Sequence, residues 1–303
     1  MRSGHIGGMT SVSDGFFWSL ELKPKIAQTP LFLAGIMTMT TPAASQAQTP
    51  QSPPSYADLA DPALASPIVV QARITRSWRL KPDEAPDVAP GRIRLLIEAE
   101  IERLIVGASG LPPMIRYLVD VPQDAKGRPP KVKKLDVIAF LSGDSTRPGQ
   151  LRLVARDAQL NWTPALDETV RGILKEAAAP GGRLRISGVT SAFHIPGAVP
   201  GESESQIFLS TSEQRPVSLS ILRRPGEQPR WSVAMGDFVD EAARPPEPET
   251  LAWYRLACSL PAALPVTATS RLSGQDKLAV ARDYQVVLQS LGPCGRTRGA
   301  GMR

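Results

Sequence analysis

Alternating apolar and polar side chains mark a run of short β-strands between residues 67 and 158. In residues 68–80 most even positions are apolar and most odd positions are polar, and Arg76 is the exception. In residues 92–102 the odd positions carry aliphatic side chains, and most even positions carry charged ones. A period of two residues is that of a half-buried strand, so both segments are predicted to be strands.

Three further strands are predicted at residues 115–121, 135–141 and 151–156. Five short strands with no helix between them favour a small antiparallel β-barrel or sandwich. Their order and lengths are similar to those of an OB-like barrel, a shape that does not by itself carry a function. Residues 67–160 are therefore predicted to form this first domain.

A helix is predicted to begin after Thr163, which can cap it, with Pro164 at its first position and an end at residues 180–182. Four strands with the same alternation follow, at residues 184–189, 206–211, 217–222 and 231–235. Because an apolar helix stripe and half-apolar strands can bury each other, residues 161–243 are predicted to form an α+β domain with this helix on an antiparallel sheet.

The carboxyl-terminal residues 244–303 are predicted to form a helical hairpin, with helices at residues 249–260 and 276–291. Ser273 and Asp276 have the spacing of a capping box, and Gly292 follows the second helix. The predicted fold class is α+β: an OB-like barrel, a helix-on-sheet domain and this tail.

Cys258 and Cys294 are the only cysteines, and each lies beside one of these two helices. An even number of cysteines in an exported chain favours pairing. The sequence has no Cys-x-x-Cys pair and no histidine nearby, which makes a redox or metal site a poor alternative. We expect a structural disulfide that constrains the unfolded chain by about 3–4 kcal/mol.

The amino-terminal residues have the order of a signal peptide. Lys23 and Lys25 precede the apolar residues 31–37, and small residues follow up to Ala47. The apolar run is much shorter than the roughly 20 residues that span a bilayer, which favours a cleaved leader over a retained anchor.

We expect residues 1–47 to be the signal peptide and residues 48–66 to be a polar, proline-rich linker. The mature chain is expected to be periplasmic or secreted, with no membrane span left after cleavage.

Composition narrows the classes of protein to consider. With 42% hydrophobic and 21% charged residues, the chain is neither a disordered protein nor a polytopic membrane protein. Aromatic residues make up only 5%, which leaves little surface for stacking on bases, so no nucleic-acid partner is expected. The net charge of +6 is compatible with weak attraction to an anionic polymer.

Glu98, Glu100 and Glu102 share one face of the second predicted strand, with a spacing of about 7 Å between successive side chains. Carboxyls at this spacing can act as acid or base, or bind a hard cation. Arg73 and Arg79 of the first strand can also face them, so cross-strand ion pairs explain the same residues.

His194 is the only histidine beyond the leader, which excludes a metal site built from several histidines. The chain contains neither Gly-x-Ser-x-Gly nor Ser-x-x-Lys, and it has no glycine-rich phosphate-binding motif. His194 is therefore a candidate catalytic residue, with a structural role as its alternative. We expect no metal and no cofactor.

The densest positive charge lies in residues 126–134, between the third and fourth predicted strands. The basic residues there are Lys126, Arg128, Lys131, Lys133 and Lys134. They are candidates for binding phosphate or uronate groups, and an ordinary solvated hairpin loop is the alternative. Residues 194–205 are the best candidate for a functional loop, because binding and catalytic residues lie on loops more often than the length of the loops alone would predict.

Several strings in the chain are distinctive: YLVDVP at 117–122, DAKG at 124–127, GESE at 201–204, LRRPG at 222–226, LAWYRLAC at 251–258 and LGPCGR at 291–296. Together they resemble an uncharacterised family of exported alphaproteobacterial proteins, over roughly residues 55–297. The resemblance implies export and no known activity.

Two functions are predicted from these features. The first is a non-catalytic binding or structural protein of the cell envelope, whose partner is an anionic envelope polymer or another envelope protein. The alternative is a carboxylate-dependent hydrolase of an envelope polymer, with Glu98, Glu100 or Glu102 as acid or base.

Overall fold

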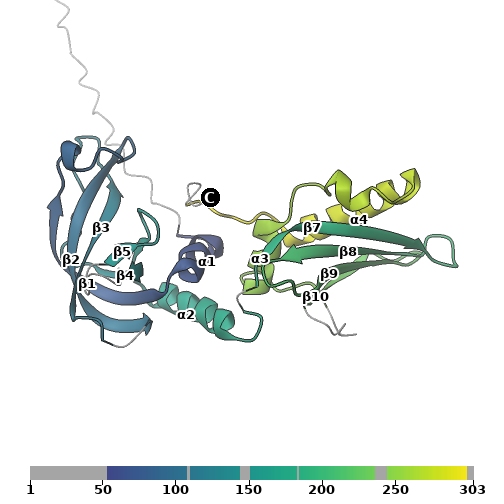
Figure 1. Cartoon of the computed structure of the whole chain (residues 1–303), viewed down its shortest axis with the longest axis horizontal. Coiled ribbons are helices and arrows are strands. Elements are labelled where there is room, and N and C mark those ends of the chain that lie inside the picture. Colours follow the sequence, from purple (N-terminus) through teal and green to yellow (C-terminus); the bar gives the residue numbers. More distant parts are fainter. Residues whose placement is uncertain (1–52, 108–109, 144–150, 183, 236–243, 299–303) are drawn as a thin grey trace, which may run out of the picture. The chain divides into compact units, whose positions relative to one another are not determined.

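Residues 53–107, 110–143, 151–182, 184–235 and 244–298 are described by a computed structural model (Figure 1). They form a mixed α+β fold with two antiparallel sheets and four α-helices. The sequence predicts the α+β class and three of these helices, but not α1. The predicted signal peptide, residues 1–47, lies outside the described residues.

The first sheet contains β1 (Ile68–Arg79), β2 (Arg92–Val106), β3 (Met114–Pro122), β4 (Asp136–Gly143), β5 (Leu151–Leu153) and β6 (Gln159–Asn161). The second contains β7 (Ile186–Pro196), β8 (Ser203–Thr211), β9 (Val217–Arg223) and β10 (Arg230–Met235). The α-helices are α1 (Tyr56–Ala65), α2 (Pro164–Ala178), α3 (Leu251–Ser259) and α4 (Gly274–Leu291).

Helix α1 lies within the segment predicted to be a linker, residues 48–66. It begins with a capping box: the Asp58 amide donates to Ser55 Oγ at 3.2 Å, and the Ser55 amide donates to the Asp58 carboxylate at 3.0 Å. Ala57, Leu59 and Ala60 are buried in the core. The linker prediction is therefore wrong for Tyr56–Ala65, because this short run has both a cap and an apolar face.

The first sheet is open among the described residues. Its order is β3-β2-β1-β4-β5, and β6 pairs with β4. One backbone hydrogen bond, from the Asp120 amide to the Arg156 carbonyl at 2.8 Å, joins β3 to the segment after β5. A single bond is not a ladder, so the described strands form no closed barrel, and the predicted OB-like barrel is not confirmed.

A β-bulge in β1 changes which side chains face the core. Ile74 lies opposite Ala99 in β2 while Arg76 lies opposite Glu98, so Thr75 is an extra residue in the ladder. Before the bulge Val70, Ala72 and Ile74 are buried, but after it Arg76 and Trp78 point to the solvent face. Arg76, the exception in the sequence pattern, marks this change.

Helix α2 begins as predicted. The Leu166 amide donates to the Thr163 hydroxyl at 3.2 Å, and Pro164 occupies the first position. However, α2 contacts α1 and α3, and the helix that packs on β7 and β8 is α4 (Figure 1). The apolar stripe of α4, with Val280, Tyr284 and Val287 fully buried, covers the apolar face of this sheet.

Strands β7 and β8 are longer than predicted. They are paired up to Pro196 and Ser203, so most of the segment 194–205 belongs to a hairpin and only residues 197–202 connect its strands. The prediction of a long functional loop is therefore wrong, because alternation continues to the tip despite the prolines and glycines.

The predicted disulfide between Cys258 and Cys294 is present. It joins the last turn of α3 to the segment after α4, and the Trp253 indole adds a hydrogen bond to the Leu291 carbonyl at 2.8 Å. Helix α4 begins at Gly274, with the Asp276 amide donating to the Ser273 hydroxyl. None of the helices in the described ranges has the length and apolar character needed to cross a membrane.

Candidate functional site

The three glutamates proposed for catalysis lie on β2, and the structure gives Glu98 two arginine partners. Its carboxylate is 3.2 Å from Arg76 Nη1 and 2.6 Å from Arg116 Nη2, and the residue is 7% exposed. Arg76 comes from β1 and Arg116 from β3, on either side of Glu98 in the register. Each carboxylate oxygen of Glu98 is thus held by an arginine, which makes Glu98 part of a cross-strand ion-pair cluster.

Glu102 accepts hydrogen bonds from Arg73 Nε at 2.8 Å and from Gln71 Nε2 at 3.2 Å. Glu100 is exposed, between Arg73 and Met114 in the register. The predicted ion pair with Arg73 is confirmed for Glu102, while Arg79 instead donates to the Gly127 carbonyl at 3.3 Å. The acidic row is thus explained largely by cross-strand pairs.

His194 belongs to a polar network beneath α4. Its Nδ1 lies 2.9 Å from Ser205 Oγ, the Ser205 hydroxyl donates to Asp283, and Arg223 Nε also donates to Asp283. In a serine hydrolase the histidine lies between the serine and the acid, whereas here the serine lies between the other two. Ser205 is 0% exposed and cannot reach a polymer, so the network joins α4 to the sheet.

Sequence reasoning identified His194 but missed Ser205 and Asp283. Asp283 falls three residues after Val280 and four before Val287, within the apolar stripe of α4. A carboxylate at a core-facing helix position needs buried partners. This position of Asp283 is the signal in the sequence from which the network could have been found.

The basic loop, residues 126–134, connects β3 to β4, and Asp124 fixes its start. The carboxylate of Asp124 accepts hydrogen bonds from the amides of Lys126 at 2.9 Å and Arg128 at 2.8 Å, and from Arg128 Nε at 2.9 Å. These hydrogen bonds, first those from Arg128, lower the pKa of Asp124 and keep it ionised. The loop backbone is therefore ordered at its first turn.

The end of the basic loop is attached to β1. The Lys134 amide donates to the Ile74 carbonyl at 2.8 Å, and the Ile74 amide donates to the Leu135 carbonyl at 2.9 Å. Val132 is buried, which anchors the middle of the loop. The basic side chains between these anchors project into solvent.

All five basic residues of the loop, Lys126, Arg128, Lys131, Lys133 and Lys134, are exposed. Arg128 pairs with Asp124 at 2.9 Å, and in the part of the chain that the structure describes no carboxylate lies within ion-pair distance of the four lysines. The loop can therefore offer positive charge to an anionic ligand without first breaking ion pairs.

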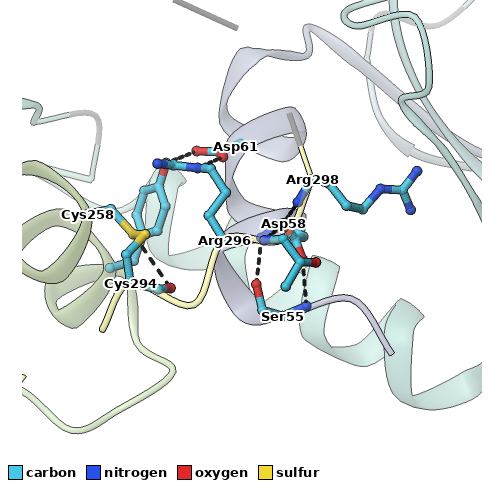
Figure 2. A network of polar contacts seen from close by, with 9 residues as sticks. Ser55, Asp58, Asp61, Cys258, Cys294, Arg296 and Arg298 are labelled. Atoms are coloured by element: carbon cyan, nitrogen blue, oxygen red, sulfur yellow. Dashed lines mark hydrogen bonds and ion pairs between the residues drawn. A yellow bond between two sulfur atoms is a disulfide. The ribbon is translucent and has the colours of Figure 1, made fainter. Parts of the chain in front are cut away.

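A second polar network holds α1 to the carboxyl-terminal segment (Figure 2). Asp58 accepts hydrogen bonds from the Thr297 amide at 2.8 Å, the Thr297 hydroxyl at 2.6 Å and the Arg298 amide at 2.7 Å. Burial acts to raise the pKa of Asp58, but the hydrogen bonds from Thr297, Arg298 and Ser55 outweigh it, so the pKa is lowered.

Asp61 extends this network by pairing with Arg296 and by accepting a hydrogen bond from the Tyr254 hydroxyl at 2.5 Å. All of these partners are satisfied within the chain, which is the pattern of a structural clamp. Among the described residues, no group of three or more histidine, cysteine, aspartate or glutamate side chains is placed to bind a metal ion.

No protein-family model matches the chain, and no curated protein matches it. The resemblance to an uncharacterised family of exported alphaproteobacterial proteins stays a prediction. The assignment of function therefore depends on the chain's own side chains.

Proposed function

We propose that this chain is an exported protein of the cell envelope that binds an anionic polymer and does not alter it chemically. The observation that carries the proposal is the basic loop, residues 126–134. Its backbone is fixed at both ends, and its lysines are exposed without carboxylate partners among the described residues.

Export is supported by two independent features. The amino-terminal pattern is that of a leader, and the disulfide between Cys258 and Cys294 is of a kind that persists in oxidising compartments. The proposed location is therefore the periplasm or the extracellular space, where polymers carrying repeated carboxylate or phosphate groups are available as partners.

Lysine suits a polymer ligand better than a single small anion. Its ammonium group is a point charge on a flexible stem, so several lysines can follow repeated anions without a fixed geometry. Binding of this kind weakens steeply with salt, because exposed charges are screened over about 10 Å at 0.1 M ionic strength.

Polyphosphate is the simplest probe, and binding to it can be measured by biolayer interferometry at low and high salt. We expect Lys131→Gln/Lys133→Gln to weaken binding by about three- to tenfold at low salt, since each exposed charge contact contributes modestly. The matched control is Arg271→Gln/Lys277→Gln, which removes the same charge from exposed residues elsewhere. If both variants lost the same amount of polyphosphate affinity, the loss would be due to net charge alone, and the basic loop would not be the binding site.

The hydrolase alternative has no observation in its favour. Glu98 and Glu102 are engaged by arginines, and Ser205 is enclosed. Glu100 is exposed, which leaves one carboxyl of the row without a second free carboxyl of that row beside it. Another envelope protein as partner is also compatible with the basic loop, and the comparison of polyphosphate with an acidic protein surface would separate the two.

A further inference from the structure

The bulge at Thr75 places a tryptophan on the solvent face of the first sheet. Trp78 of β1 lies directly opposite Leu96 of β2, and Leu96 lies directly opposite Leu118 of β3. Trp78 is 43% exposed and Leu118 is 38% exposed. The three side chains therefore form one apolar row across three neighbouring strands, which we call the Trp78 row.

Two arginines flank this row. Arg76 and Arg116 lie two residues from Trp78 and Leu118 along their strands, a step of about 7 Å. Both side chains are largely exposed, and both pair with one carboxylate, that of Glu98. Each guanidinium group has five N–H donors and the Glu98 contacts use only some of them, so the two arginines offer further hydrogen-bond donors beside the apolar row.

The alternative is an ordinary sheet surface with scattered apolar residues, which is common in soluble proteins. Elsewhere on this face of β2 the residues are charged: Arg94, Glu98, Glu100 and Glu102. A solvated face of an antiparallel sheet is usually polar throughout, so three aligned apolar residues that include a tryptophan are a departure from the pattern.

We propose that the Trp78 row and its two arginines bind a segment of a uronate-bearing polysaccharide. A sugar ring has an apolar C–H face that packs on the indole and the leucines, and its carboxylate lies at the ring edge, within reach of a guanidinium. Arginine is suited to this contact because its planar donors match a carboxylate. The proposal takes its ligand class from the proposed function and assigns the sugar contact to a different surface.

The chemistry of the row favours a polysaccharide over single-stranded nucleic acid. Proteins that bind single strands stack successive bases on several aromatic rings, whereas this row has one ring and two aliphatic side chains. Arg79, the residue after Trp78, points to the other face of β1 and donates a hydrogen bond there to the Gly127 carbonyl of the basic loop. The row and the basic loop are therefore two separate binding surfaces.

The test compares two probes that differ in their sugar rings. Polygalacturonate carries carboxylates on sugar rings, and polyphosphate carries anions without rings. We expect Trp78→Ala to weaken binding of polygalacturonate by about tenfold, from the loss of one stacked ring, and to leave polyphosphate binding unchanged. Arg116→Gln should also weaken polygalacturonate binding. Leu278→Ala, at an exposed leucine of α4, is the control for loss of an apolar surface residue.

Several results would overturn the proposal. They are unchanged polygalacturonate binding by Trp78→Ala, an equal loss for both probes, tighter binding of single-stranded DNA than of polygalacturonate, or no binding of polygalacturonate by the wild type. Leu118→Gln, which alters the other end of the row, must reproduce the loss in a variant that melts at the wild-type temperature. The proposal that the basic loop binds an anionic polymer is tested separately: it fails if Lys131→Gln/Lys133→Gln leaves polyphosphate binding unchanged.

Discussion

Asp283 takes its role from its position in α4 rather than from its residue type. It is 1% exposed among apolar neighbours, and its two carboxylate oxygens accept from the Ser205 hydroxyl and from Arg223. A buried carboxylate is tolerated only when its partners are in place. The site therefore fixes where α4 lies along the second sheet.

Replacing Asp283 with alanine should lower the free energy of unfolding by about 2–4 kcal/mol. The substitution leaves the fully buried Ser205 hydroxyl without this acceptor and removes the carboxylate that pairs with the partly exposed Arg223 guanidinium. Urea denaturation followed by circular dichroism measures the change. Lys277→Ala, at an exposed position of the same helix, should cost almost nothing. An Asp283→Ala protein as stable as the wild type would contradict this role.

Asp58 makes the stability depend on pH. Its pKa is lowered in the folded protein below the ordinary value of 3.8, so its ionised form favours the folded state. This contribution is complete above the unfolded pKa and is lost as the pH falls through the folded pKa. We expect wild-type stability to fall more steeply than that of Asp58→Asn below about pH 4.

Denaturation curves of the wild type and of Asp58→Asn, measured between pH 2 and pH 6, test this directly. Asparagine keeps one oxygen acceptor for the amides of Thr297 and Arg298 but turns an amide donor toward the Ser55 amide, so the variant starts less stable at pH 6. Parallel curves over the whole range would show that Asp58 does not contribute to the pH dependence.

Residue roles that depend on local sequence were predictable. The cap at Thr163 follows from the residues beside it. The disulfide follows from the presence of only two cysteines and from the expected oxidising compartment. The partners of Glu98 were not predictable, because Arg116 belongs to a third strand and Arg76 reaches the face only through the bulge. Pair identities of this kind require the register, which the alternation of side chains does not give.

At the scale of elements, the bulge in β1 is the feature that most changes the surface. Strand existence was predictable from the alternation, and the pattern even contained the irregularity at Arg76. The bulge could not be placed, because one misfit residue is equally consistent with an exposed polar side chain on a regular strand. Its consequence is that Trp78 lies on the solvent face rather than in the core.

Deleting Thr75 should therefore be tolerated. Without the extra residue, Ile74 and Arg76 become consecutive, and Ile74 still faces the core while Arg76 still faces solvent. Only the hydrogen bond from the Thr75 hydroxyl to the Glu98 carbonyl is lost, which costs about 1 kcal/mol. Deleting Ser77 is the matched control, because it turns Trp78 toward the core and should cost several times more. Chemical denaturation of the two deletions compares them, and equal costs would argue against a bulge at Thr75.

At the scale of the whole molecule, the described chain is closed by contacts between its two ends. Thr297 binds Asp58 across 239 positions, and Arg296 binds Asp61 across 235. No pattern of local periodicity reports on such contacts, which explains why α1 was predicted as part of a linker. The disulfide was predicted, but the binding of the segment that follows Cys294 to Asp58 and Asp61 of α1 was not.

Removing the disulfide should loosen α1 in particular. Cys258→Ser/Cys294→Ser should lower the free energy of unfolding by about 3–4 kcal/mol, because the unfolded chain regains the freedom of a loop closed over 36 positions. Cys294 also holds the segment that binds Asp58 and Asp61, so the amides of α1 should exchange hydrogen faster relative to those of β1. Hydrogen exchange with mass spectrometry measures both elements in one experiment.

Asp283→Ala provides the comparison that separates a local effect from a global one. It is expected to lower stability by a similar amount through the second sheet, without touching the clamp. If the clamp acts as described, α1 loses protection ahead of β1 in the disulfide variant but not in Asp283→Ala. Equal acceleration of α1 and β1 in both variants would mean that the disulfide stabilises the molecule as a whole and does not specifically hold its amino-terminal helix.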